Sequence, residues 1–145
     1  WLSTKFQLDV ENLQDIPAQI ETRLMASLAR LRRTSVDLLQ LHNRIGSRPG
    51  GRVMTVEQVL GRNGVADGLE RLREKGLIRH AGITALGEAG PVCEVIRSGR
   101  FDSALIVLTG VSGLHDQGAV VVRTPPQIAQ IDTRHAHAAA LRRMD

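Results

Sequence analysis

The chain has 145 residues, a length that suits a single domain. Hydrophobic residues make up 42% and charged residues 23%, which argues against a disordered chain, and no apolar run reaches the roughly 18 residues of a membrane span. The sequence contains no tyrosine, so any mechanism that needs a phenol from this chain is excluded. It opens on Trp1 without an initiator methionine, and we therefore expect a fragment or a processed piece.

The formal net charge is +4, and all but two of the 19 basic residues are arginines. Because the planar guanidinium suits phosphates, an arginine-rich nucleic-acid binder is one hypothesis. The arginines are scattered among acidic residues without stacking aromatics nearby, which favours solvated helix faces instead. The single cysteine, Cys93, excludes an internal disulfide and indicates a reducing compartment, so we predict a cytoplasmic protein. We expect Cys93 itself to be a small core residue.

The first third of the chain predicts strand, helix and strand. Residues 1–8 form a short extended run, and Asp15 is a candidate N-cap with Pro17 in the first helical turn. Residues 36–41 are a nearly continuous apolar run, typical of a strand buried on both faces. The helix between them carries one apolar stripe, formed by Ile20, Leu24, Leu28 and Leu31.

The rest of the chain continues this alternation. Residues 44–52 form a loop by composition, and Thr55 and Gln58 have capping-box spacing. A helix through Val65, Leu69 and Leu72 then ends at Gly76, a left-handed stop. Further predicted elements are a strand at 77–84, a helix at 91–97, strands at 103–108 and 119–122, and a weakly patterned helix at 136–144.

Apolar strands that alternate with helices indicate an α/β fold with a parallel sheet and helices outside it. The alternation fails after about residue 109, because too few residues separate the last two strands for a crossover helix. We therefore divide the chain into residues 1–109, a β/α region, and residues 110–145, a divergent tail.

Two ionisable residues stand at the carboxyl ends of consecutive predicted strands, where parallel sheets bind ligands. They are Lys5 in STKF and His42 after VDLLQL. A lysine beside a neutral imidazole can polarise a carbonyl group or tune the pKa of an acid. By spacing alone this pair is also compatible with a structural role.

Five separated segments carry longer patterns. They are a strand with Thr4-Lys5, a helix with S-L-x-R-L at 27–31, a strand V-D-L-L-x-L-H at 36–42, a helix with L-x-x-L-x-x-x-G-x-I-R at 69–79, and a strand with Gly82-Ile83-Thr84. In this order and spacing the chain resembles the aldo/keto reductase family over about residues 1–107.

The resemblance implies a (β/α)8 TIM barrel that binds NADPH and passes a hydride to an aldehyde or ketone. Four family residues serve the chemistry: an aspartate, a tyrosine acid, a lysine and a histidine. By position, Lys5 is the family lysine and His42 the family histidine, and Asn43 follows at the substrate mouth. Thr84 stands where the family usually has a serine that contacts the nicotinamide carboxamide.

The chain also departs from the family pattern. The family aspartate and tyrosine would lie before residue 1, and Ala85, Leu105 and Leu108 replace an asparagine, a glutamine and a tyrosine. The helix after 103–108 and the later elements that grip the adenosine phosphate are replaced by the tail. We therefore expect a partial barrel, strands three to six, that lacks the first strands and the C-terminal part. We expect no reductase activity from this chain alone.

Alternative interpretations stay open at this stage. One is a non-enzymatic truncated product, or a half-barrel that a partner chain completes, with self-association through exposed sheet edges. His135 and His137 lack an evident third ligand, so we predict no metal site. Arg48 and Arg52 are weak candidates at the substrate mouth, and we expect Asp37 to pair with an arginine at a helix end.

Overall fold

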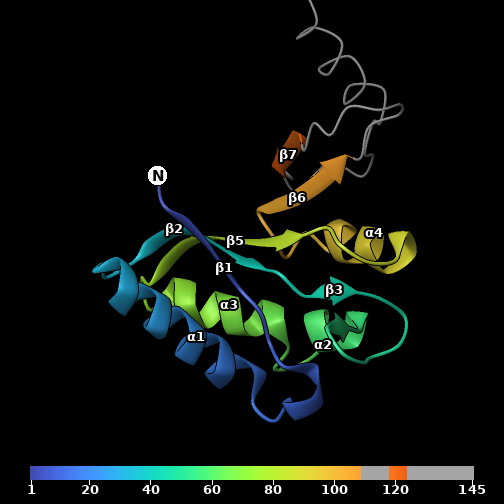
Figure 1. Cartoon of the computed structure of the whole chain (residues 1–145), viewed down its shortest axis with the longest axis horizontal. Coiled ribbons are helices and arrows are strands. Elements are labelled where there is room, and N and C mark those ends of the chain that lie inside the picture. Colours follow the sequence, from blue (N-terminus) through green and yellow to red (C-terminus); the bar gives the residue numbers. More distant parts are fainter. Residues whose placement is uncertain (109–117, 124–145) are drawn as a thin grey trace, which may run out of the picture.

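The computed structural model describes residues 1–108 and 118–123, and it contains one five-stranded sheet with helices against it (Figure 1). The strand order is β1-β2-β5-β6-β7. The strands are β1 (Ser3–Phe6), β2 (Val36–Leu41), β5 (Ile78–Thr84), β6 (Ser103–Leu108) and β7 (Gly118–Arg123), and the helices are α1 (Ile16–Leu31), α2 (Val56–Leu60), α3 (Val65–Glu74) and α4 (Ala89–Arg97).

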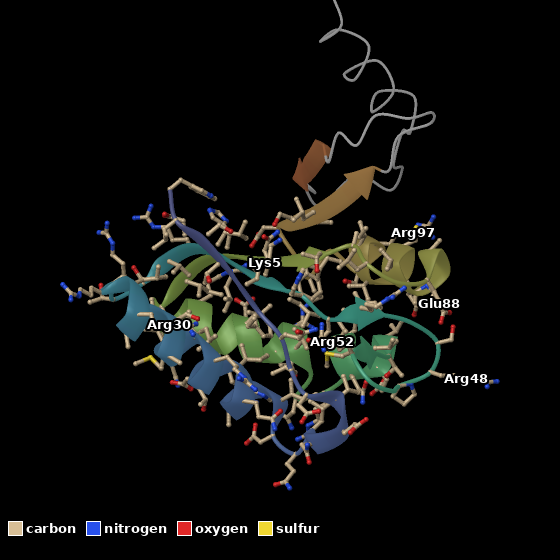
Figure 2. The ribbon with its side chains drawn as sticks, in the orientation of Figure 1. Lys5, Arg30, Arg48, Arg52, Glu88 and Arg97 are labelled. Carbon is tan, nitrogen blue, oxygen red and sulfur yellow. The ribbon has the colours of Figure 1, made fainter. Side chains whose placement is uncertain are left out.

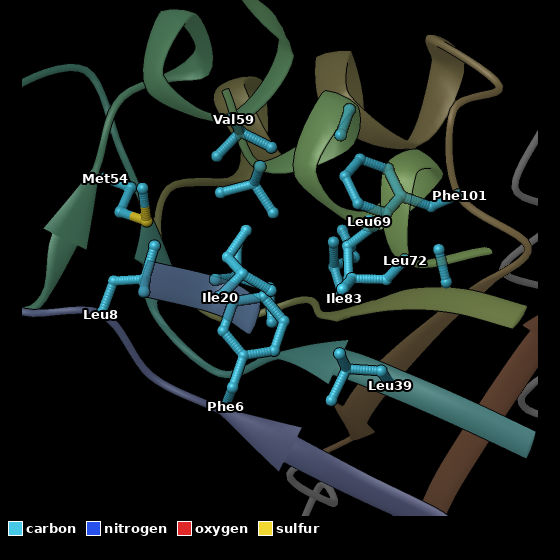
Figure 3. Packing of buried hydrophobic residues seen from close by; sticks show 14 of the residues in the cluster. Phe6, Leu8, Ile20, Leu39, Met54, Val59, Leu69, Leu72, Ile83 and Phe101 are labelled. Atoms are coloured by element: carbon cyan, nitrogen blue, oxygen red, sulfur yellow. The ribbon is translucent and has the colours of Figure 1, made fainter. Parts of the chain in front are cut away.

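The first four strands of the sheet are parallel, and helices connect each to the next. The predicted α/β class and the partial β/α barrel are thereby confirmed. In Figure 1, α1 and α3 lie below strands β1, β2 and β5, and the end of the sheet formed by β6 and β7 lies above these strands. The helix-facing side chains form the hydrophobic core, with Phe6, Leu39 and Ile83 packed against residues of α1 and α3 (Figure 3).

Helix α1 begins at the N-cap residue that the sequence predicts, Asp15, and buries most of its apolar stripe. The Asp15 carboxylate accepts a hydrogen bond from the amide of Ala18 (3.0 Å), which satisfies one of the free donors of the first turn. Three members of the predicted stripe are buried: Ile20, Leu24 and Leu28. The fourth, Leu31, is the last residue of the helix and is 41% exposed.

The predicted helix between Thr55 and Gly76 is in fact two helices. The capping box at Thr55 is present, with both of its hydrogen bonds to Gln58 (2.9 and 3.2 Å). Gly61 then ends α2 in an extended conformation, and α3 starts after Gly64. Gly76 has φ = 70°, the left-handed stop that the sequence predicts.

The segment 44–52, predicted as a loop, contains ordered strand structure. A short strand β3 (Arg44–Ile45) pairs in parallel with β4 (Val53–Met54). Ile45 also bonds the loop that follows β5, because its amide donates to Leu86 O and its carbonyl accepts from Glu88 N (both 2.8 Å). Two loops at the carboxyl end of the sheet are thus joined to each other.

Strand β7 covers the predicted strand 119–122 but runs antiparallel to β6. It is therefore not a further parallel strand of a β/α barrel. The apolar pattern of the segment predicts a strand, whereas its direction depends on how the chain returns to the sheet. The remaining predictions for the tail, including the helix at 136–144 and the roles of His135 and His137, lie outside the described residues.

Gly87 is the residue on which the contact between these two loops depends. Its φ is +123°, and a Cβ at this position would overlap with the carbonyl oxygen of Ile45. We expect Gly87→Ala to lower the free energy of unfolding by about 1–3 kcal/mol, as measured by urea denaturation. Gly90→Ala is the matched control, because no atom within 4 Å of its Cβ position belongs to anything but its chain neighbours and the backbone of its own helix. A Gly87→Ala variant as stable as the Gly90→Ala variant would contradict the requirement for glycine at position 87.

Asp67 joins α3 to the segment before β6. It accepts hydrogen bonds from the Arg100 guanidinium (2.9 Å) and the Asn63 amide (2.8 Å), and these bonds, that of Arg100 first, hold its pKa below the ordinary value. Because the pKa is lower in the folded state, the stabilisation is present above the unfolded-state pKa and is lost as pH falls through the folded-state pKa.

Urea denaturation as a function of pH tests this ion pair. We expect Asp67→Asn to remove part of the loss of stability that the wild-type chain shows on acidification below the usual carboxyl range. Glu74→Gln, at an exposed carboxylate without an ion pair among the described residues, should leave that loss unchanged. If the free energy of unfolding falls equally on acidification in Asp67→Asn and in the wild type, Asp67 does not contribute to this pH dependence.

Candidate functional site

The candidate site is the face of the sheet opposite α1 and α3. Successive side chains of a strand alternate between faces, and Phe6 lies in the core on the helix side, so Lys5 extends from the other side (Figure 2). In the strand register, Lys5 stands beside Gln40, Gln40 beside Gly82, and Gly82 beside Ser103. These four residues form one row across four parallel strands, which we call the inner row. Lys5 is its exposed member.

Gln40 and Ser103 are members of this row that sequence analysis missed. Both are buried, at 3% and 5% exposure, and Gln40 Nε2 and Ser103 Oγ have no hydrogen-bond partner among the described residues. Both groups pack over Gly82, where a Cβ would lie 3.0 Å from Gln40 Cγ and overlap with Ser103 Oγ. The available signal was a polar residue within each apolar strand, VDLLQL and SALIVL.

His42 and Thr84 lie close together, each two residues beyond a member of the inner row, Gln40 and Gly82 respectively. His42 follows β2 and Thr84 ends β5, and the His42 Nδ1 lies 3.3 Å from Thr84 Oγ1. The Thr84 hydroxyl also donates to the carbonyl oxygen of Leu41 (2.9 Å). Thr84 is 3% exposed, whereas His42 is exposed. The imidazole thus stands at the rim of the sheet with a buried hydroxyl beneath it.

Asn43 occupies a different position from its neighbour His42. It is fully buried, its Oδ1 accepts from the amide of Leu8 (2.8 Å), and its Nδ2 donates to the carbonyls of Leu8 (2.8 Å) and Arg52 (3.4 Å). The side-chain amide therefore fastens the segment after β1 to the segment after β2. Its contacts are with main chain that borders the site.

The rim loop 46–52 is held to the start of α4 by a carboxylate. Glu88 accepts hydrogen bonds from the hydroxyl and the amide of Ser47 (2.5 and 3.2 Å). These bonds, together with the charge of Arg48, keep the pKa of Glu88 below its ordinary value. Arg48 and Arg52, the weak candidates for the substrate mouth, are both exposed on this loop.

Three arginines of the described part of the chain lie far apart on its surface. Arg30 on α1, Arg48 on the rim loop and Arg97 on α4 lie on separate elements and extend in different directions (Figure 2). This arrangement fits solvated helix and loop surfaces, as the scattered sequence pattern suggests. A stripe of phosphate contacts would need neighbouring guanidinium groups along one surface.

Asp37 does not pair with a helix-end arginine, and that prediction is wrong. Its carboxylate accepts from the amide of Leu2 (2.7 Å) and lies 3.4 Å from Arg79, which is on strand β5. The Leu2 hydrogen bond is the main reason that the pKa of Asp37 is lowered. The parallel register of β2 and β5 brings Asp37 and Arg79 to the amino ends of the strands, far from the rim that carries His42.

Other site types find no support in residues 1–108 and 118–123. No group of three metal-ligating side chains occurs among them. No helix in the same described ranges has the length and apolar character to cross a membrane. Cys93 is partly buried on α4.

Parallel β/α units with polar side chains at the carboxyl ends define this structure as part of a β/α barrel. The aldo/keto reductase family model matches residues 1–108, and the chain belongs to that family. The fold is similar to that of an aldo-keto reductase from Bacillus halodurans in its holo form, with a TM-score of 0.52 and 22% identity. That match covers 74% of this chain and 34% of the other. A search of curated protein sequences finds no match.

The side chains at and around Thr84 are the ones that the family resemblance places beside a nicotinamide carboxamide. The Thr84 hydroxyl is buried and already bonded to Leu41 and beside His42. Ala85 and Leu105, its neighbours along and across the strands, carry no side-chain amide that could bind a carboxamide. Thr84 Oγ1 already donates its proton to Leu41, and the side chains of Ala85 and Leu105 cannot form hydrogen bonds, so none of these three side chains is free to donate to a carboxamide oxygen. Lys5 and His42 fit a carbonyl or hydroxyl group.

Asn43→Ala tests the role of the buried amide at the rim. It leaves the amide and the carbonyl of Leu8 without their partner, so we expect the free energy of unfolding to fall by about 1–3 kcal/mol. Asn12→Ala, at an exposed asparagine, is the control and should change it by less than about 0.5 kcal/mol. A small effect of Asn43→Ala in urea denaturation would argue against this role.

Proposed function

We propose that this chain is the central part of an NADPH-dependent oxidoreductase that transfers a hydride to an aldehyde or ketone, and that it has no reductase activity alone. One observation carries the proposal: Lys5 and His42 extend from the same face of adjacent parallel strands, at the carboxyl end of the sheet. Membership of the aldo/keto reductase family supports the reaction class.

Lys5 and His42 would each act on the oxygen of the substrate or on the acid beside it. An ammonium group stabilises negative charge that develops on a carbonyl oxygen, and it lowers the pKa of a neighbouring acid. An imidazole orients the same oxygen through a hydrogen bond. Residues 1–145 contain no tyrosine, so in this proposal the phenolic acid comes from a different polypeptide segment.

The cofactor is assigned by family resemblance and not through Thr84. Since Thr84 Oγ1 already donates to Leu41 and the side chains of Ala85 and Leu105 cannot form hydrogen bonds, we propose that most of the dinucleotide contacts come from residues other than these three. We propose a cytoplasmic location and a small carbonyl compound as substrate.

A second candidate function is a non-enzymatic half-barrel that needs a partner chain. The unpaired edge of β1 favours it, because β1 pairs only with β2 among the described strands. An exposed edge of this kind accepts another strand. In this alternative, removal of the Lys5 or His42 side chain has no effect on the activity of the completed barrel.

A chimera separates the two functions. Residues 1–108 would replace the matching segment of the Bacillus halodurans reductase, which provides the remainder of the barrel. We expect the folded chimera to consume NADPH with an aromatic aldehyde, and Lys5→Met and His42→Gln each to lower kcat by about a hundredfold or more. The chain alone should show neither turnover nor saturable binding in a fluorescence titration to millimolar NADPH.

Lys75→Met is the matched control, since Lys75 forms a surface ion pair with Glu21 (2.7 Å), and it should retain activity. A folded chimera without activity, or one indifferent to Lys5→Met, would favour the scaffold function. Micromolar binding of NADPH by the chain alone, lost in Thr84→Asp, would show that the cofactor contacts lie in this chain after all.

A further inference from the structure

We propose that Gln40 and Ser103 are contact points for the segment that completes the barrel, and that this segment places a side-chain acceptor oxygen over Gly82, between the two. The interaction surface is the inner face of the sheet, and its partner is the remainder of an aldo/keto reductase barrel. This assignment uses the family membership of the chain and is independent of the proposed reaction.

Gln40 and Ser103 end in hydrogen-bond donors that lack acceptors. Gln40 Nε2 carries two protons and no lone pair, and Ser103 Oγ carries one proton. Both atoms are buried without a partner among the described residues, so they bond neither to each other nor to the main chain there. A buried donor in this state has lost its bonds to water and gained nothing in return. The pair therefore requires an acceptor from elsewhere.

The neighbours along the two strands do not supply this acceptor. Side chains two residues apart on a strand share a face, so Leu38 lies beside Gln40, and Leu105 beside Ser103. Leu38 is 6% exposed but is not part of the core on the helix side, which agrees with a position on the inner face. His42, on the other side of Gln40, is exposed at the rim and forms no bond with Nε2.

The neighbours across the strands do not supply it either. Lys5, beside Gln40 in the register, has an ammonium group that can only donate. Gly82 stands between the pair and has no side chain. A Cβ at this position would lie 3.0 Å from Gln40 Cγ and overlap with Ser103 Oγ. Glycine thus allows the two side chains to approach each other over one point of the inner face.

A side chain from the completing strands fits this requirement. The interior of a β/α barrel is filled by side chains from all of its strands, whereas the main chain of each strand bonds to the neighbouring strands. The structural match covers only 34% of the Bacillus halodurans reductase, so most of that chain lies outside the matched part. A carboxylate, amide or hydroxyl oxygen has two lone pairs, and one such oxygen can accept from both donors.

Urea denaturation of the full chain tests whether the pair lacks an acceptor. Gln40→Met and Ser103→Ala remove the donors at similar side-chain volume. We expect each to leave the equilibrium constant of unfolding unchanged or to lower it by up to about fivefold. Gln14→Met and Ser35→Ala, at exposed positions, are the matched controls. A rise beyond that of the controls would overturn the proposal, because the acceptor would then come from this chain, from a second copy or from water.

The chimera with the remainder of the Bacillus halodurans reductase tests the partner. There Gln40→Met and Ser103→Ala should each raise the equilibrium constant of unfolding by about fivefold or more, because each leaves the completing side chain without a donor. The two control substitutions should leave it unchanged. A folded chimera in which the inner-face variants behave as they do in the full chain would overturn the proposal.

If the chimera does not fold, the full chain alone supports or overturns the proposal by the direction in which its unfolding equilibrium constant changes. Unfolding in urea needs neither NADPH nor substrate. Failure of the proposed function would therefore appear as absent turnover in the chimera assay, and not as a change in these equilibrium constants.

Discussion

The backbone hydrogen bonds between β1, β2, β5 and β6 fix the height of every side chain on the sheet, and the alternation of side chains fixes its face. Phe6, Leu39 and Ile83 enter the core beneath α1 and α3 for this reason. The same rule turns Lys5 and Gln40 to the inner face. A register change of one residue in β2 would exchange the two sets, so the core and the candidate site depend on the same ladder.

The rim of the sheet is built by a second group of contacts that involve main chain. The Asn43 amide joins the segments after β1 and β2, and Ile45 joins the loop after β2 to the loop after β5 through Leu86 and Glu88. These contacts place His42 and Thr84 on neighbouring strand ends without any direct restraint on the imidazole itself. The ring is thus positioned by its backbone and by one hydroxyl, while its outer edge stays accessible.

Much of the fold could be predicted from the sequence, because the apolar spacing of α1, the cap at Asp15 and the capping box at Thr55 are local signals. The site could be predicted only in part. His42 and Asn43 are consecutive and polar, and only the period of the strand separates an exposed imidazole from a fully buried amide. The contact of His42 with Thr84 and the position of Asp37 beside Arg79 required the register of β2 against β5. The apolar run at 119–122 predicts a strand, but it carries no signal for whether that strand runs parallel or antiparallel to its neighbour.

The antiparallel pairing of β7 has a consequence for any completion of the barrel. A strand has two hydrogen-bonding edges, and β6 uses one for β5 over three residue pairs and the other for β7 over six. A further parallel strand would need the edge that β7 occupies. A parallel neighbour of β6 and the antiparallel strand β7 therefore compete for the same row of amides and carbonyls, and a segment that continued the parallel sheet from β6 would have to displace β7 first.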